Sequence, residues 1–187
     1  TTVTQGTTYQ IAIAGKNGAA GLTVLKIGTV PPNDDFANAE TISGRAVRLT
    51  ATNLNSSRQN GEAVPPNGAG HTLWYKWTAP DSGRYHVAAF STEVDATAAV
   101  YVGSSVADVT GIAANDNSSA TNSDSLVRFE ATAGTTYFIQ VDNTRRDGSE
   151  GGNITLTLAD SVWEFPVDDE VTSSPAVASD GTVYFGS

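Results

Sequence analysis

Apolar and polar residues alternate along the middle of the chain, which is the pattern of strands buried on one face. In residues 73–77, Leu73, Tyr75 and Trp77 fall on one face and Trp74 falls on the other. The same alternation recurs in residues 85–89, 127–129, 137–141 and 154–158. Turn-forming clusters of Gly, Pro, Asp and Ser separate these runs. Short strands roughly ten residues apart predict an all-β, antiparallel β-sandwich. One short helical turn is expected over residues 34–41.

A segment near the start of the chain repeats a segment of the middle. Residues 6–13 read Gly-Thr-Thr-Tyr-Gln-Ile-Ala-Ile, residues 134–141 read Gly-Thr-Thr-Tyr-Phe-Ile-Gln-Val, and five of the eight positions are identical. The spacing between the two copies equals the length of the segment 33–160. A Gly-rich turn and a second alternating strand follow each copy. The alternative is that Gly-Thr-Thr-Tyr is simply a common sequence at the start of a strand. This would explain the eight-residue match but not the second alternating strand after each copy, so a true repeat is favoured.

These patterns divide the chain into three parts. Residues 1–32 are expected to be the terminal hairpin of a preceding copy, closed by the stiff linker Pro31-Pro32. Residues 33–160 are expected to form the sandwich. Residues 161–187 do not repeat the sandwich and predict an incomplete pair of strands, with an Asp-Gly turn at residues 180–181.

Composition and charge narrow the class of protein. The chain has a formal net charge of −10 and no Cys or Met. Without Cys there is no disulfide scaffold, Cys-ligated zinc site or thiol nucleophile. An acidic chain is repelled by phosphate backbones and anionic lipids, so neither nucleic acid nor a membrane is an expected partner. A chain that starts at Thr1 without Met is expected to be a processed product or a fragment.

Residues 33–158 resemble the bacterial pre-peptidase C-terminal (PPC-like) β-sandwich family. The matching segments, in the order of the family, are residues 33–39, 74–80, 100–103, 115–118 and 133–137. The resemblance implies a secreted, non-catalytic accessory domain on large bacterial proteins, of which some relatives bind calcium, protein or polysaccharide. Residues 163–165, 173–177 and 180–187 look like the opening of a PQQ-like β-propeller repeat. A single repeat cannot close a propeller, so no quinone is expected.

No arrangement of residues favours catalysis. The chain contains two histidines, His71 and His86, and neither belongs to a His-Glu-x-x-His motif. There is no Gly-x-Ser-x-Gly nucleophile motif. We therefore expect that the protein is not an enzyme.

Calcium is the cofactor to consider. It requires six to eight oxygen ligands, and Asp and Asn residues cluster in three predicted loops. The favoured metal-ligating acids are Asp34, Asp35, Asp95 and Asp116. The alternative is that these residues form ordinary turns and that Asp34 caps a helical turn.

Trp74 is the candidate ligand-binding residue, because its indole lies on the face opposite Tyr75 and could stack on a sugar ring or a protein. The favoured alternative is that a loop at residues 55–66 covers it.

The sequence thus predicts an extracellular, structural or adhesive module at the bacterial cell surface. Strand exchange with neighbouring copies could build fibres, because a lone hairpin cannot bury its apolar face. The alternative is a calcium-assisted module that binds a polysaccharide or matrix protein and targets an attached domain.

Overall fold

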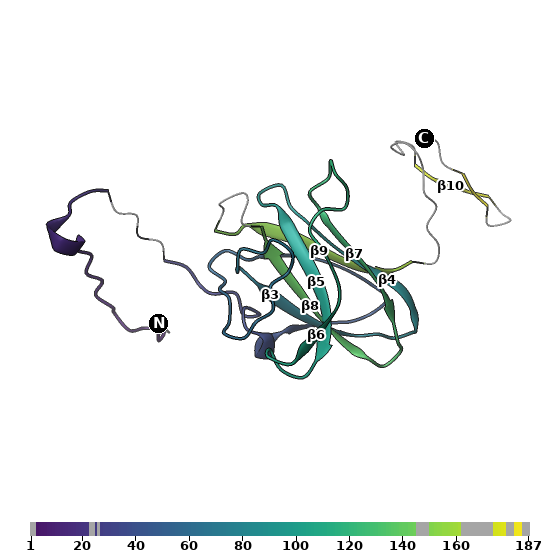
Figure 1. Ribbon diagram of the computed structural model, residues 1–187, viewed down its shortest axis with the longest axis horizontal. Helices are drawn as coiled ribbons and strands as arrows, with labels where there is room; N and C mark the ends of the chain where they lie inside the picture. The colour runs from purple at the N-terminus through teal and green to yellow at the C-terminus, as the bar shows by residue number, and fades with distance from the viewer. Residues whose placement is uncertain are drawn as a thin grey trace.

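Two β-sheets lie face to face in the middle of the chain (Figure 1). The computed structural model describes residues 3–22, 25, 27–144, 150–161, 174–178 and 182–184. The first sheet has the order β1 (Glu40–Ile42), β3 (Leu73–Thr78), β8 (Thr136–Asn143), β5 (Ala96–Gly103) and β6 (Val109–Asn115). The second has the order β2 (Ala46–Thr52), β9 (Asn153–Asp160), β4 (Gly83–Phe90) and β7 (Ser125–Ala131). These pairings are antiparallel except that of β1 with β3. The predicted antiparallel β-sandwich is confirmed.

The main core lies between the two sheets, where the predicted alternation places it. Tyr75, Trp77 and Val87 have 1%, 0% and 0% of their surfaces exposed, and the polar residues between them point outward or toward loops. Tyr85, Phe129 and Tyr137 surround the Trp77 ring with centroid distances of 4.7–6.3 Å. These four aromatic side chains come from β3, β4, β7 and β8, and their packing stabilises the contact between the two sheets.

A second, smaller core lies on the outer face of the first sheet. It contains Phe36, Ala39, Trp74, Ala99 and Tyr101. β5 is therefore buried on both faces over residues 96–101, and its apolar residues do not alternate with polar ones.

The entry to the sandwich differs from the predicted helical turn. A single 3₁₀ turn, η2 (Phe36–Asn38), precedes β1, and its N-cap residue Asp35 makes no side-chain capping bond. Strand pairing of β1 with β3 begins at Glu40, so the rest of the predicted helical turn is extended chain and strand.

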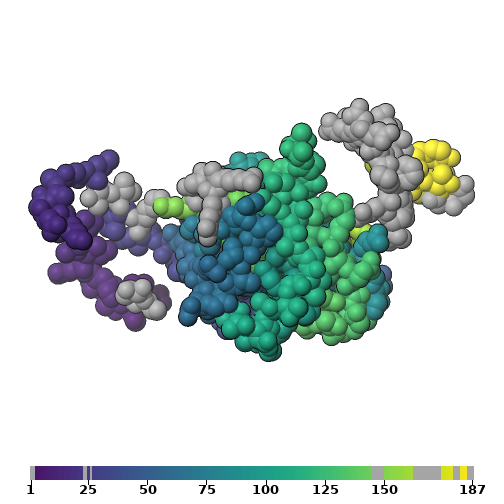
Figure 2. All heavy atoms as spheres, viewed as in Figure 1, coloured from purple at the N-terminus to yellow at the C-terminus, as the bar shows by residue number. Residues whose placement is uncertain are grey.

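Residues 3–30 are called the arm, and its described residues extend away from the sandwich (Figures 1 and 2). The described residues of the arm include one 3₁₀ turn, η1 (Lys16–Gly18), and belong to no paired strand. Seven of its apolar side chains from Val3 to Ile27 are more than two-fifths exposed: Val3, Tyr9, Ile11, Ile13, Leu22, Leu25 and Ile27. The terminal hairpin predicted for residues 1–32 stays a prediction.

The carboxyl-terminal segment lies mostly outside the described residues. Within it, β10 (Ala176–Val177) pairs antiparallel with β11 (Val183–Tyr184). The propeller resemblance of residues 161–187 stays a prediction. Across the part of the chain that the structure describes, no helix has the length and hydropathy needed to cross a membrane.

Candidate functional site

The arm begins with the same turn that leads into β8. Gly6 and Gly134 both adopt a left-handed backbone, with φ of 79° and 77°, which glycine adopts without steric cost. The amide of Thr4 donates to the Tyr9 hydroxyl at 2.8 Å, and the amide of Thr132 donates to the Tyr137 hydroxyl at 3.0 Å. A tyrosine hydroxyl that binds the backbone a few residues upstream is a recurrent corner in β-sandwiches. The sequence repeat is therefore also a repeat of local structure.

A second backbone bond completes this correspondence. The amide of Thr7 donates to the Thr4 carbonyl at 3.2 Å, and the amide of Thr135 donates to the Thr132 carbonyl at 3.1 Å. The turn forms in the arm without any help from the sandwich, because local hydrogen bonds and a glycine suffice for it.

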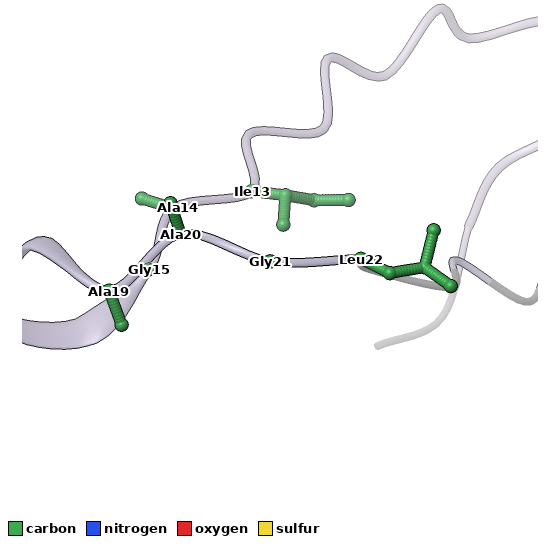
Figure 3. Close-up of a pocket in the computed structure, with 7 residues that line it drawn as sticks. All are labelled: Ile13, Ala14, Gly15, Ala19, Ala20, Gly21 and Leu22. Atoms are coloured by element: carbon green, nitrogen blue, oxygen red, sulfur yellow. The ribbon is translucent and has the colours of Figure 1, made fainter.

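The arm also turns back on itself after this strand-like segment. Residues 13–15 and 19–22, on either side of η1, line a shallow hollow between them (Figure 3). No ionisable side chain lines the hollow, so it offers no catalytic group. The arm therefore has two limbs, one on either side of η1, and the first matches the start of β8 in sequence.

The inward-facing residues of the two copies are nearly the same and differ mainly in what covers them. Tyr137, Ile139 and Val141 of β8 are 4%, 0% and 1% exposed in the main core. Their counterparts Tyr9, Ile11 and Ile13 are 47%, 57% and 54% exposed. The arm thus presents a row of alternate apolar side chains that no described residue covers.

The outer face of β8 is closed by a loop over residues 53–66, which we call the covering loop. Gln140 of β8 donates to the Glu62 carboxylate at 2.8 Å and to the Ala63 carbonyl at 3.0 Å, and it accepts from the Tyr101 hydroxyl at 2.9 Å. Glu62 is 2% exposed and Gln140 has no exposed surface. Burial, followed by the charge of Glu62, raises the pKa of Tyr101 to about 12. The Tyr101 hydroxyl therefore stays protonated and donates to Gln140.

Two other outward-facing residues of β8 are also engaged. Phe138 stacks on Phe36 with ring centroids 4.3 Å apart. The Asp142 carboxylate accepts from the amides of Gly70 and His71, both at 2.9 Å. Burial raises the pKa of Asp142, and the hydrogen bonds from the Gly70, His71 and Asn143 amides oppose this effect. The outer face of β8 thus depends on specific polar partners, although it was the apolar inner face that the sequence pattern revealed.

Trp74 is under the covering loop and does not form a surface platform. Its side chain has no exposed surface, its Nε1 donates to Glu62 at 2.7 Å, and Phe36 packs edge-on against its ring. The prediction that Trp74 binds a ligand is corrected. A loop covers the indole, as the alternative predicted. Glu62 was missed because a single Glu in a loop carries no pattern that marks it as buried.

Three of the four acids predicted to bind calcium accept hydrogen bonds from three different residues. Asp35 is exposed, and the carboxylate of Asp34 accepts from the amide and hydroxyl of Ser57. Asp95 accepts from the Thr144 hydroxyl at 2.9 Å, and Asp116 accepts from the Asn67 amide group at 2.6 Å. Among the described residues, no three His, Asp or Glu side chains are grouped so as to hold a metal ion. Calcium binding stays a prediction.

The histidines make structural contacts. Nδ1 of His71 lies 3.1 Å from the Ser56 carbonyl oxygen, and Nδ1 of His86 lies 2.9 Å from the Ser161 hydroxyl. Neither bond joins the histidine to a carboxylate that would orient it as a general base.

The region from β3 to β8 is similar to a known family. Residues 71–143 match the model of the bacterial pre-peptidase C-terminal domain family. The pre-peptidase C-terminal match covers less than half of the chain and begins just before β3 and ends with β8. The predicted resemblance is confirmed for these residues. The propeller resemblance has no such support.

Three of the solved structures that match this chain are distant from it in sequence. The pre-peptidase C-terminal domain of a collagenase from Bacillus anthracis is 14% identical, with 65% of this chain and 92% of that chain covered and a TM-score of 0.40. PliG of Aeromonas hydrophila, a periplasmic inhibitor of g-type lysozyme, is 16% identical, with coverage of 66% and 97% and a TM-score of 0.41. PliG of Salmonella Typhimurium is 10% identical, with coverage of 66% and 99% and a TM-score of 0.35. No curated protein matches this chain.

Proposed function

We propose that this chain is a non-catalytic, extracellular structural module of a larger bacterial surface or secreted protein. The sandwich is its rigid unit, and the arm joins it to a neighbouring module by adding two strands to that module's sheets. A series of such joints gives a fibre or an adhesive stalk. The observation that carries the proposal is the row of Tyr9, Ile11 and Ile13, which are exposed although they follow the same turn as the buried row of β8.

The free energy of burial favours such a joint. An apolar side chain of this size contributes about 1.5–3 kcal/mol when it moves from water into a core. A two-stranded hairpin alone does not bury these side chains, whereas a sheet that accepts it does. A catalytic role has no comparable support, because the described histidines are engaged in structural contacts.

The test is a tandem polypeptide in which residues 33–131 precede Thr4 of the full chain. In this polypeptide the arm follows an added copy of β7 with the same spacing as β8 follows β7 in the sandwich. We expect a second folded sandwich, in which the amides of Ile11 and Ile13 exchange with solvent far more slowly than in the single chain. The Y9S/I11S/I13S variant is the control and removes the protection.

The contradicting outcome is equally specific. Two tandems are measured, one with the native arm and one in which the arm carries the outward-facing residues of β8. If the arm amides exchange as fast in both tandems as in the single chain, the arm cannot be a pair of sandwich strands.

A calcium-assisted binding module is the second candidate. One observation favours it, which is that Oδ1 of the buried Asp116 has no hydrogen-bond partner while Oδ2 accepts from Asn67. Titration calorimetry with calcium, followed by thermal unfolding with and without a chelator, tests this candidate. Binding heat that is lost in D116N supports it, and unchanged melting together with no heat contradicts it.

A further inference from the structure

We infer that the module that accepts the arm is not a second copy of this sandwich but a different sandwich of the same architecture, in which no polar loop is closed over the accepting position. This inference rests on the proposed joint and specifies its partner. It comes from comparing the outward-facing residues of the two copies, since the inward-facing residues are nearly the same.

The arm keeps Thr8 at the position of Thr136 but lacks the three other outward-facing side chains that β8 uses. Aligned on the shared turn, Gln10 occupies the position of Phe138, Ala12 that of Gln140 and Ala14 that of Asp142. By contrast, the inward-facing positions are Tyr in both copies, Ile in both copies, and Ile13 against Val141. The arm therefore has the apolar face of β8 without these three side chains of the other face.

An arm in the place of β8 would leave buried and half-buried polar groups without partners. The Tyr101 hydroxyl would lose its acceptor, Gln140, and the carbonyl of Ala63 would lose its donor. The amides of Gly70 and His71 would lose the Asp142 carboxylate. Each buried polar group that loses its partner lowers the folding equilibrium constant by about 5- to 100-fold.

Identical copies also have no vacant place for the arm. β8 pairs with β3 on one side and β5 on the other, and β9 pairs with β2 and β4. The arm of a second copy would have to displace strands that fit better than it does. The accepting sandwich is therefore one that lacks its own last two strands and tolerates small side chains where this one has Gln140 and Asp142.

The residues on the face of the arm opposite Ile11 indicate what kind of surface can pack over that face. Ala12 and Ala14 are small and apolar, and Gln10 is polar. A sheet face that is open to water, or covered by apolar residues over Ala12 and Ala14, satisfies all three. A covering loop with a buried carboxylate such as Glu62 does not. This difference discriminates against self-association by leaving polar groups unpaired in the wrong partner.

Two experiments test the inference. The first places the arm's residues in β8 of the full chain as F138Q/Q140A/V141I/D142A, with V141I alone as the matched control. Urea unfolding is expected to show at least a tenfold smaller folding constant for the quadruple variant than for V141I. Equal stability of the two would overturn the inference, because the arm would then fit this sandwich as well as β8 does.

The second experiment uses the tandem polypeptide, so that a quadruple variant that does not fold leaves the inference testable. Two tandems are compared, one with the native arm and one with Q10F/A12Q/A14D in the arm. We expect the added sandwich to unfold at a higher urea concentration with the substituted arm. Equal midpoints would overturn the inference and leave the proposed joint standing. An arm that is unprotected in both tandems would instead overturn the joint.

Discussion

The arm and the β8–β9 pair carry the same pattern but differ in their surroundings. Both begin with a left-handed glycine and a tyrosine whose hydroxyl accepts from the amide five residues upstream. One copy has its apolar row in the main core and the other has it in water. Local sequence therefore sets the turn and the alternation, whereas neighbouring strands decide whether the row becomes part of a core.

This comparison predicts that the two copies contribute unequally to stability. β8 lies between β3 and β5, so both of its backbone edges are paired and both of its faces are covered. The described residues of the arm have neither sheet partners nor cover. Changes at equivalent positions should therefore separate the role of the sequence from the role of its surroundings.

The largest difference is expected for isoleucine at the shared inward position. I139A removes a side chain with no exposed surface and should lower the free energy of unfolding by about 2–5 kcal/mol. I11A changes a side chain that is 57% exposed and should change it by less than about 0.5 kcal/mol. Urea unfolding of the full chain measures both. Comparable losses in the two variants would mean that the arm packs on the sandwich in solution.

The outer face is tested by E62Q. Glu62 accepts from Trp74 and Gln140 through Oε1 and from the amide of Gln59 through Oε2. A glutamine keeps one acceptor oxygen and turns its amide group toward another donor. We therefore expect the free energy of unfolding to fall by about 1–3 kcal/mol.

E40Q, at an exposed position, is the matched control for E62Q and should change the free energy of unfolding by less than about 0.5 kcal/mol. A near-neutral E62Q would show that the covering loop does not depend on the carboxylate. The inference that the arm binds a different sandwich would then lose one of the polar contacts on which it rests.

The sequence predicted the inner faces well, because alternation reports directly which side chains share a face. It did not predict the second core, since alternation does not say whether the other face is covered. Trp74 and Phe138 both point away from the main core, and a loop and η2 cover them. The apolar residues on both faces of β5 were the available signal, because strands buried on both faces lose their alternation.

The predicted site residues show the same limit. Asp34, Asp95 and Asp116 accept hydrogen bonds from groups that are 23, 49 and 49 residues away in the chain, so their partners are visible only in the fold. The repeat was visible in the sequence. The polar partners that distinguish β8 from the arm come from residues 62–71 and 101, and only the fold brings them to β8.

A pH titration should separate the copies through Asp142, whose counterpart in the arm is Ala14. Because burial raises the pKa of Asp142 above the ordinary 3.8, the folded state binds this proton more tightly than the unfolded state does. The contribution of Asp142 to stability therefore falls as the pH rises from below 3.8 through the raised pKa, and stays lower above it.

D142N should lack this fall, which is read as the difference between the urea midpoints of the two proteins across the acidic range. The control is A14D, which places a carboxyl group at the exposed counterpart and should leave the pH profile of the sandwich unchanged. If D142N and the unchanged chain have parallel profiles, the Asp142 carboxyl group titrates alike in the folded and unfolded states.

The smallest difference is expected from removing the hydroxyl groups of the shared corner. Y137F removes the acceptor of the Thr132 amide at a residue that is 4% exposed, and should cost about 0.5–1.5 kcal/mol. Y9F removes the equivalent acceptor of Thr4 in the arm, where water replaces it, and should leave the urea midpoint of the single chain unchanged. Amide exchange at Thr4 should nevertheless become faster in Y9F, because the turn is held by its own hydrogen bond.

In the tandem polypeptide, Y9F should destabilise the added sandwich as Y137F destabilises the original one. A Y9F variant without effect in the tandem would show that the arm's tyrosine corner does not enter an accepting sandwich.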